Sequence, residues 1–287
     1  MPRGIDHLVL CVEDLKKARA HYEKLGFTMT PPAQHPFGTG NTLAQLDGCF
    51  LEVLAVTRPE DITEAGAENF SFAAFNRDYL ESRQGMSMLV LDSADEKADR
   101  AEFLEKDLRV YAPFEFQRLA KLPDGSEQTV GFSLTFLADA SLPDMAFFTC
   151  KQWRPDLFWK ADYQKHANGA ETVDEVFVVT PEPAQPIQFL AAFADATDFE
   201  TDEGIARIRT TRGTLGVYTP VAFEARFPGA FAPTGLTSPC FAGFAVKTDD
   251  PAAAARLWRD AGLDVRETDG RPWLHPDDAF GCVIVAA

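Results

Sequence analysis

The stretch Ile5-Asp6-His7-Leu8-Val9-Leu10 places an imidazole inside an apolar run at the start of the chain. Alternate residues of a β-strand point to opposite faces. We therefore expect His7 to share one face with Ile5 and Val9, while the two leucines face the helix that follows. Glu52 lies on a later apolar run, Phe50-Leu51-Glu52-Val53-Leu54, where its neighbours Leu51 and Val53 would pack under the same helix. An imidazole and a carboxylate on inward-facing strand positions of one unit suit a divalent metal.

The strand and helix pattern returns three more times along the chain. The first strands of the four units are 7–10, 88–91, 175–178 and 243–246. Each is followed by a polar turn, by apolar residues at helical spacing, and by three short extended runs, which in the first unit are 27–31, 39–46 and 49–56. The pattern predicts an α+β fold of four βαβββ modules paired into two cupped mixed sheets.

Three segments interrupt the repeat and define the predicted domain organisation. Residues 58–84 form a long connection rich in charge and Phe, and residues 153–169 separate the second and third units. We place a domain boundary near Gly169, which predicts an N-terminal domain at 1–169 and a degenerate C-terminal domain at 170–287. A third irregular stretch, 221–239, links the last two units.

Composition excludes several classes of protein. The 287-residue chain carries a net charge of -17 and has no basic cluster of the kind that phosphate contacts need, so we expect no nucleic-acid partner. No apolar run is long enough to span a membrane, and the first strand begins too early for a signal peptide. The five cysteines are single and odd in number, which favours buried thiols in a reducing cytoplasm over disulfides.

At this point the motifs resemble those of a known superfamily. They are Gly4-Ile5-Asp6-His7, Tyr22-Glu23-Lys24-Leu25-Gly26-Phe27, His35-Pro36-Phe37-Gly38-Thr39-Gly40-Asn41, Leu51-Glu52, Phe147-Phe148-Thr149-Cys150 and His166-Ala167-Asn168-Gly169-Ala170. Together with the paired modules, they resemble the vicinal oxygen chelate superfamily of glyoxalases and extradiol dioxygenases, and within it glyoxalase-like proteins of the glyoxalase_3 type. The resemblance covers about residues 4–170, and the C-terminal part is similar only as a degenerate repeat of the module.

The resemblance implies a metal site between the first two modules. His7 and Glu52 fill the ligand positions of the first module, whereas the second module departs from the pattern, with Met88 and Phe148 at the corresponding positions. In the third and fourth units only Glu175 is a possible ligand. A third ligand would come from His35 or His166, which lie outside the repeat. Such mixed nitrogen and oxygen ligands suit Zn, Mn, Fe or Ni.

The function implied is a glyoxalase-like enzyme of the lyase or isomerase type, acting on a small organic substrate with vicinal oxygens. Glu52 or a metal-bound water would serve as the base. The side chains expected to touch the substrate are His35, Asn41, Met88, Phe148 and His166. Two alternatives stay open: a metal-free small-molecule-binding protein, and an extradiol-dioxygenase-like enzyme. For His166 the pattern favours a turn over a substrate contact. A substrate carboxylate could be held by Arg77, Arg83 or Arg118, although a solvated surface is favoured for each. We expect a monomer or a homodimer.

Overall fold

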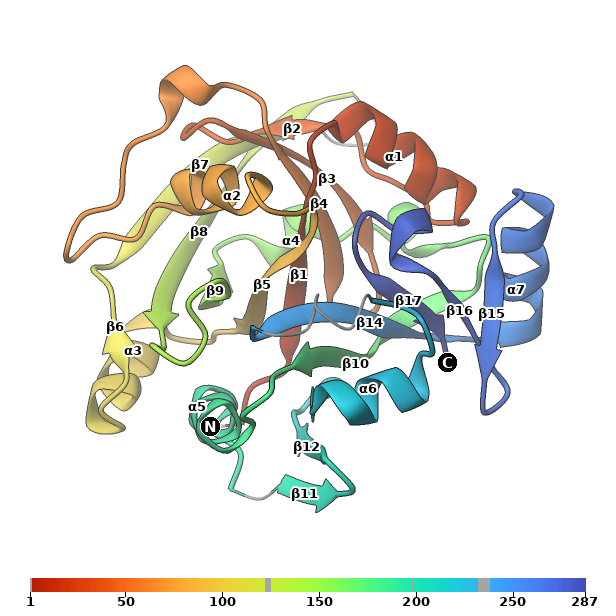
Figure 1. Ribbon diagram of the computed structural model, residues 1–287. Coiled ribbons are helices and arrows are strands. Elements are labelled where there is room, and N and C mark those ends of the chain that lie inside the picture. Colours follow the sequence, from red (N-terminus) through yellow and green to blue (C-terminus); the bar gives the residue numbers. More distant parts are fainter. Residues whose placement is uncertain (1, 122–124, 198, 232–237) are drawn as a thin grey trace.

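Two mixed β-sheets form the frame of the molecule, shown as a computed structural model in Figure 1. The structure describes residues 2–121, 125–197, 199–231 and 238–287. Strands β1 to β9 belong to one sheet and strands β10 to β17 to the other. The predicted α+β fold is confirmed. The change of sheet between β9 and β10 falls near Gly169, although independent folding of 1–169 and 170–287 stays a prediction.

The N-terminal sheet is built around the antiparallel pair β1–β5, in the order β2-β3-β4-β1-β5-β9-β8-β6, with β7 paired to β8. Its first module comprises β1 (Ile5–Cys11), α1 (Leu15–Lys24), β2 (Ala33–Gln34), β3 (Thr39–Gln45) and β4 (Phe50–Val56). Its second comprises β5 (Gly85–Asp92), α3 (Glu96–Glu105), β6 (Arg109–Val110), β7 (Phe114–Lys121), β8 (Glu127–Ala138) and β9 (Ala146–Gln152). In both modules the first strand lies parallel to the last.

The C-terminal sheet repeats this plan around the antiparallel pair β10–β14, in the order β11-β12-β13-β10-β14-β17-β16-β15. The third module comprises β10 (Ala170–Val179), α5 (Ala184–Ala194), β11 (Phe199–Asp202), β12 (Ile205–Arg209) and β13 (Thr214–Tyr218). The fourth comprises β14 (Cys240–Thr248), α7 (Pro251–Asp260), β15 (Val265–Thr268), β16 (Arg271–Leu274) and β17 (Val283–Ala286).

Local sequence signals set the ends of the module helices. Asp14, Asp95 and Asp250 each accept a hydrogen bond from a backbone N–H in the first turn of α1, α3 and α7. Gly26 and Gly262 follow the ends of α1 and α7 with φ of 90° and 83°, a left-handed conformation that glycine adopts at little cost. No helix among the described residues is long and apolar enough to cross a membrane.

The strand pleat divides the buried residues into a shared core and two cup clusters. Leu8, Leu10, Leu89 and Leu91 of the N-terminal sheet join Val176, Val178, Phe244 and Val246 of the C-terminal sheet in the shared core. The opposite face of β1 and β5 presents Val9, Cys11, Met88 and Val90 to an aromatic cluster, here called the first cup. Phe177 and Tyr218 belong to the corresponding cluster on the C-terminal sheet, the second cup. All five cysteines are free and buried, as expected.

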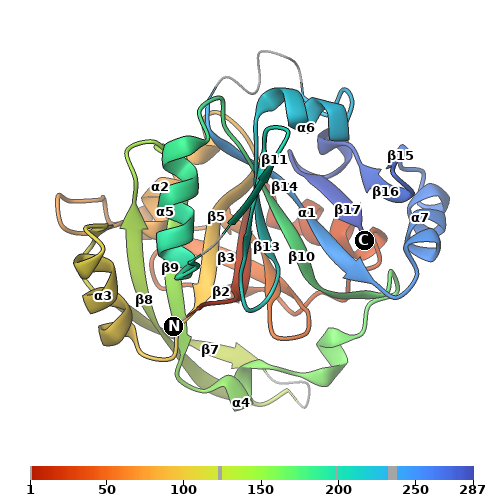
Figure 2. The same ribbon diagram turned by 90° about the horizontal axis from the view of Figure 1, so that it is seen from below.

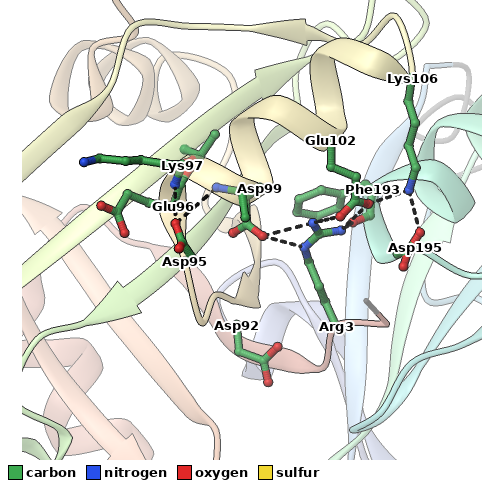
Figure 3. Close-up of polar contacts among 12 residues, drawn as sticks. Arg3, Asp92, Asp95, Glu96, Lys97, Asp99, Glu102, Lys106, Phe193 and Asp195 are labelled. Carbon is green, nitrogen blue, oxygen red and sulfur yellow. Dashed lines mark hydrogen bonds and ion pairs between the residues drawn. The ribbon is translucent and has the colours of Figure 1, made fainter.

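The two halves are also joined by an ion-pair network between α3 and α5, which lie side by side in Figures 1 and 2. Arg3 donates to Asp99 at 3.0 Å, to Glu102 at 2.7 Å and to the carbonyl oxygen of Phe193 at 3.1 Å (Figure 3). Lys106 donates to Asp195 at 2.7 Å, just after α5 ends. The network therefore fixes the first residues of the chain, next to β1, against the third module.

Three segments differ from the sequence prediction. Residues 27–31 are not a strand: Thr30 donates to the carbonyl oxygen of Leu43, and the two prolines that follow have no N–H to continue a ladder. The two long connections contain helices. Helix α2 (Phe72–Leu80) lies within 58–84, and α6 (Pro220–Arg226) begins one residue before 221–239 and continues into it; residues 232–237 lie outside the described residues. Both helices contribute buried phenylalanines to the cup clusters.

Candidate functional site

A β-bulge at the start of β1 brings Asp6 and His7 together. Ile5 pairs with Leu91 of β5 and His7 pairs with Val90, so one residue of β1 is extra. The Nδ1 atom of His7 lies 2.6 Å from Oδ2 of Asp6, a contact that neighbours on a regular strand do not make. The prediction that Ile5 shares the face of His7 is wrong, because the bulge reverses the alternation and Ile5 packs in the shared core.

Glu52 lies beside His7 on the same face of the sheet. Its neighbours Leu51 and Val53 point into the shared core, as predicted, and the carboxylate enters the first cup. The Nε2 atom of His7 is 3.6 Å from Oε2 of Glu52. Asn41 on β3 donates from Nδ2 to Oε1 of Glu52 at 2.5 Å and so fixes the carboxylate. The predicted convergence of His7 and Glu52 in one hollow is therefore observed.

His35 completes the polar cluster from the loop after β2. Its Nδ1 atom is 2.8 Å from the hydroxyl of Thr39, and its Nε2 atom is 3.8 Å from Oε1 of Glu52. Burial, with smaller effects of the charges of Arg118 and His7, holds the pKa of His35 well below its usual range. The ring is therefore neutral near pH 7. With Nδ1 donating to Thr39, its Nε2 atom accepts from Nδ2 of Asn41 at 3.2 Å.

Aromatic rings enclose this cluster in a cavity of about 40 Å³, here called the inner cavity. Phe50 stacks on the imidazole of His7 with ring centroids 4.3 Å apart, and Phe148 meets the same ring edge-on at 5.5 Å. The remaining lining residues are His35, Phe37, Asn41, Leu43, Glu52, Phe72, Phe116, Arg118, Phe132, Leu134, Cys150 and Phe158. A water molecule occupies about 30 Å³ of liquid, so the inner cavity holds an ion and little more.

A wider cavity of about 520 Å³, here called the outer cavity, leads to the inner one. The two share His35, Asn41, Leu43, Arg118 and Phe158. Gln45 anchors the linker after β9 over this region, since it donates to the carbonyl oxygen of Phe158 at 2.8 Å and accepts from the backbone N–H of Lys160 at 3.0 Å. A cavity of this size suits a small ligand.

Two predicted substrate contacts lie elsewhere. Met88 is on the cup face but fully buried, 4.0 Å from the amide nitrogen of Asn76, and lines neither cavity. His166 accepts from the backbone N–H of Thr28 at 3.0 Å and lies 2.8 Å from the carbonyl oxygen of Gln45. It therefore ties the linker to the first module, which matches the turn role rather than the ligand role. His35, Asn41 and Phe148 do line the inner cavity.

Sequence reasoning missed Asp6, Gln152 and the position of Arg118. Gln152 at the end of β9 donates to Oδ1 of Asp6 at 3.2 Å, so Asp6 is held from both sides. Only the pair Asp6-His7 carried a sequence signal, because a carboxyl group beside a ligand histidine is the usual orienting partner. Arg118 reaches the cup from β7, a strand that adds to the βαβββ pattern.

The polar atoms at the inner cavity fit a divalent cation. With Asp6 at Nδ1 of His7, the Nε2 atom of His7 faces Glu52 at 3.6 Å. Nε2 of His35 lies 3.8 Å from Glu52 and shares the amide nitrogen of Asn41, at 3.2 Å, with it. The Oδ1 atom of Asn41 is buried without a hydrogen-bond partner. Buried acceptors that face one another need a cation or a proton among them. The two imidazole nitrogens approach different oxygens of the one carboxylate, Oε2 at 3.6 Å from His7 and Oε1 at 3.8 Å from His35.

A second arrangement of ligand atoms involves the other side of the same imidazole. In the described residues, Asp6, His7 and Cys150 have ligand atoms that all lie within 4.8 Å of one another. Burial, reinforced by the nearby carboxylates of Asp6 and Glu52, holds the pKa of the Cys150 thiol well above its usual range. A neutral thiol is a poor metal ligand, so this side of the ring is better suited to orienting His7.

In the second cup, the acid that sequence reasoning named, Glu175, is held by protein donors. Glu175 accepts from the hydroxyl of Tyr218 at 2.5 Å and from Arg226 at 3.0 Å, and Arg226 also contacts that hydroxyl. Burial raises the pKa of Glu175, against the lowering effect of Arg226. Both carboxylate oxygens are thus occupied by protein donors.

Comparisons with known proteins agree with this architecture. The family model of the glyoxalase-like domain matches residues 5–194, and the chain belongs to this family. A hypothetical protein from Staphylococcus aureus has a similar structure, with a TM-score of 0.71, 13% identity, and 99% of each chain covered. A triple mutant of 4-hydroxymandelate synthase from Streptomyces coelicolor has a TM-score of 0.59 and 13% identity, with 99% of this chain and 92% of that chain covered. No curated protein matches the sequence. At such low identity the structural similarity shows the fold alone.

Proposed function

We propose that this glyoxalase-like protein is a metal-dependent enzyme of the lyase or isomerase type that acts on a small organic substrate with vicinal oxygens. The observation that carries the proposal is the convergence of His7, His35 and Glu52 on one buried cavity. Nε2 of His7 lies 3.6 Å from Oε2 of Glu52, and Nε2 of His35 lies 3.8 Å from Oε1. All three side chains line the inner cavity.

His7, His35 and Glu52 would hold the ion, and Zn, Mn, Fe or Ni each accepts such a ligand set. A bound divalent cation supplies Lewis-acid polarisation of a substrate oxygen. Asp6 keeps the lone pair of His7 on Nε2, and Asn41 keeps Oε1 of Glu52 in place. The aromatic walls exclude water, which strengthens every charge interaction within the cavity.

Glu52 is the only acid among the residues that line the inner cavity. It is therefore our candidate for the base that removes a proton from a carbon next to a substrate oxygen. Its Oε2 atom is the oxygen available for this transfer, because Oε1 accepts the hydrogen bond of Asn41. The surrounding rings leave room for only the reacting end of a substrate.

A second candidate function is oxygen chemistry with ferrous iron. Two histidines and one carboxylate are the ligand set of many non-haem iron oxygenases, and His7, His35 and Glu52 supply that set. The choice between the two functions depends on which metal the protein binds and on whether substrate turnover consumes oxygen.

Metal analysis tests the proposal. The protein is purified without oxygen, stripped with a chelator, reloaded with Mn, Fe, Ni or Zn, and followed by elemental analysis and melting temperature. We expect one equivalent of metal and a higher melting temperature, since a ligand at 100 times its Kd stabilises by about 2.7 kcal/mol. The variants His7→Gln, His35→Gln and Glu52→Gln should lose the metal.

His166→Gln and His275→Gln serve as matched controls and should retain the metal, because neither side chain lines the inner cavity. A wild-type protein that binds none of the four metals would exclude the enzyme proposal. The protein would then be a metal-free binding module of the same fold. Metal retained by all three site variants would place the ion elsewhere.

A further inference from the structure

Arg118 makes no hydrogen bond to a carboxylate of the described residues where the outer cavity meets the inner one. Its Nε atom is buried without a hydrogen-bond partner, and the negative charge that acts on it is that of Glu52 in the inner cavity. Its one polar contact is from Nη1 to the carbonyl oxygen of Leu119, at 3.4 Å. A guanidinium carries five donors, so Arg118 is left with most of its hydrogen-bonding capacity unused at a place where two cavities join.

The charge around the outer cavity has the opposite sign to that of the chain. Arg58, Arg118 and Lys160 line it, against the single acid Glu127, while the whole chain carries -17. Lys160 donates to the backbone carbonyl oxygen of Asp156 rather than to a carboxylate. Arg58 lies 3.9 Å from Asp61, a weak and exposed pair. A concave site with such a local excess of positive charge attracts anions.

The volumes of the two cavities indicate which part of a ligand each one can hold. The inner cavity of about 40 Å³ admits only the reacting end, and the outer cavity of about 520 Å³ holds the rest. Glutamine side chains at 34, 45 and 117 and the phenol of Tyr163 give the outer cavity further polar groups. Arg118 borders both spaces, so a group bound to it lies at the boundary between the reacting end and the remainder.

We propose that the substrate is a small organic acid whose carboxylate is bound by Arg118 at the junction of the two cavities. The planar guanidinium matches a carboxylate in a two-point contact, and the cations at Arg58 and Lys160 guide the anion to it. A carboxylate fits better than a phosphate ester, because Arg118 is the one guanidinium among the residues that line both cavities, and its fork matches two oxygens. This inference rests on the proposed function only for the identity of the reacting end, since binding at Arg118 itself requires no metal.

Paired probes of equal shape test the inference. Phenylacetate and its neutral amide, phenylacetamide, are titrated into metal-stripped and metal-loaded protein by calorimetry, with phenyl phosphate as a third probe. We expect the acid to bind at least tenfold more tightly than the amide in both preparations, since charge-assisted hydrogen bonds contribute about 1.5–3 kcal/mol. Arg118→Met should abolish the preference, and Arg118→Lys should restore part of it.

Arg77→Met is the matched control, because Arg77 is exposed, pairs with Glu64 and Asp78, and lines neither cavity. Equal affinity for acid and amide, no detectable binding of the acid, or a preference that survives in Arg118→Met overturns the inference. Tighter binding of phenyl phosphate than of phenylacetate overturns the carboxylate assignment. If the protein binds no metal but still binds phenylacetate more tightly than phenylacetamide, the proposed metal-dependent function is overturned and the carboxylate site at Arg118 is supported.

Discussion

Asp6 and His7 are neighbours in the chain, yet their side chains meet on one face of the sheet, with Oδ2 of Asp6 2.6 Å from Nδ1 of His7. The bulge between Ile5 and His7 makes this possible, because two residues of β1 oppose one residue of β5. The carboxylate fixes the tautomer and the direction of the imidazole. It therefore determines which nitrogen faces Glu52.

Replacing Asp6 with Asn should weaken metal binding without removing a ligand. Loss of a carboxylate partner of a ligand histidine typically lowers metal affinity by about 10–100-fold, and we expect a change of that size for Asp6→Asn. Competition with a coloured chelator measures it. Asp61→Asn, at an exposed position, is the control and should match the wild type. Unchanged affinity in Asp6→Asn would show that His7 is oriented by other contacts.

Much of the fold follows from sequence because the module repeats. Each first strand alternates apolar residues toward the shared core, and each helix has an aspartate or a proline at its start. The pairing of His7 with Glu52 was predictable for the same reason, since both occupy cup-facing positions on parallel neighbours. The helices α2 and α6 were missed because they lie outside the repeat, although Ser71 and Thr219 cap them.

The remainder of the site depends on features that a sequence pattern does not contain. The alternation of residues in the sequence gives no sign of the bulge, which nevertheless moves Ile5 to the other face of the sheet. His35 and His166 are both loop histidines, and only the long-range packing of their loops distinguishes the one beside Glu52 from the one that ties the linker. Met88 faces the cup as expected, but it is buried within the aromatic cluster and lines neither cavity.

Asn41→Asp should place two carboxylates side by side, and a bound divalent cation should relieve the repulsion between them. The new carboxylate would lie beside Oε1 of Glu52, where the amide nitrogen now donates at 2.5 Å. Two buried like charges repel, so we expect a lower melting temperature in metal-free buffer, and a larger rise with added metal than the wild type shows. Asn76→Asp is the control, at a buried site where the amide contacts the hydroxyl of Ser87 and the carbonyl oxygen of Phe72. An equal response of both variants to metal would contradict a cation at Glu52.

Asp195 should contribute a pH-dependent part of the stability. The hydrogen bond from Lys106 lowers the pKa of Asp195 from 3.8 to about 2. Because the pKa of Asp195 is lower in the folded than in the unfolded protein, the ionised carboxylate stabilises the folded state at pH values above 3.8. This stabilisation is lost as the pH falls from 3.8 toward 2. Asp195→Asn should cost about 1 kcal/mol or less at pH 6. Asn tolerates the left-handed φ of 54° found there, so the backbone is preserved.

Urea unfolding of Asp195→Asn and wild type at pH 6 and pH 3 measures this contribution. The difference between the two proteins should narrow at the lower pH. A difference that stays constant would mean that the asparagine perturbs packing rather than charge.

Arg226→Met should destabilise the second cup more than the loss of a surface ion pair would. Glu175 is buried and receives donors only from Tyr218 and Arg226 at hydrogen-bond distance, so removing Arg226 leaves a carboxylate without its cation. An unsatisfied buried charge costs about 1–3 kcal/mol or more, and we expect a loss of about 2 kcal/mol in urea unfolding. The double variant Glu175→Gln, Arg226→Met should regain part of it, because the charge is gone.

Arg207→Met is the matched control for this cycle, since Arg207 lies 4.0 Å from Glu175 and is partly exposed. Arg207→Met should lower the free energy of unfolding by no more than about 0.5 kcal/mol. If the double variant were no more stable than Arg226→Met alone, the destabilisation would come from the stacking of Arg226 on Phe177 and Phe227, at 5.1 and 5.2 Å, and not from the buried carboxylate. Full recovery would instead assign the whole cost to Glu175, which would mean that the second cup keeps its arginine to neutralise that one acid.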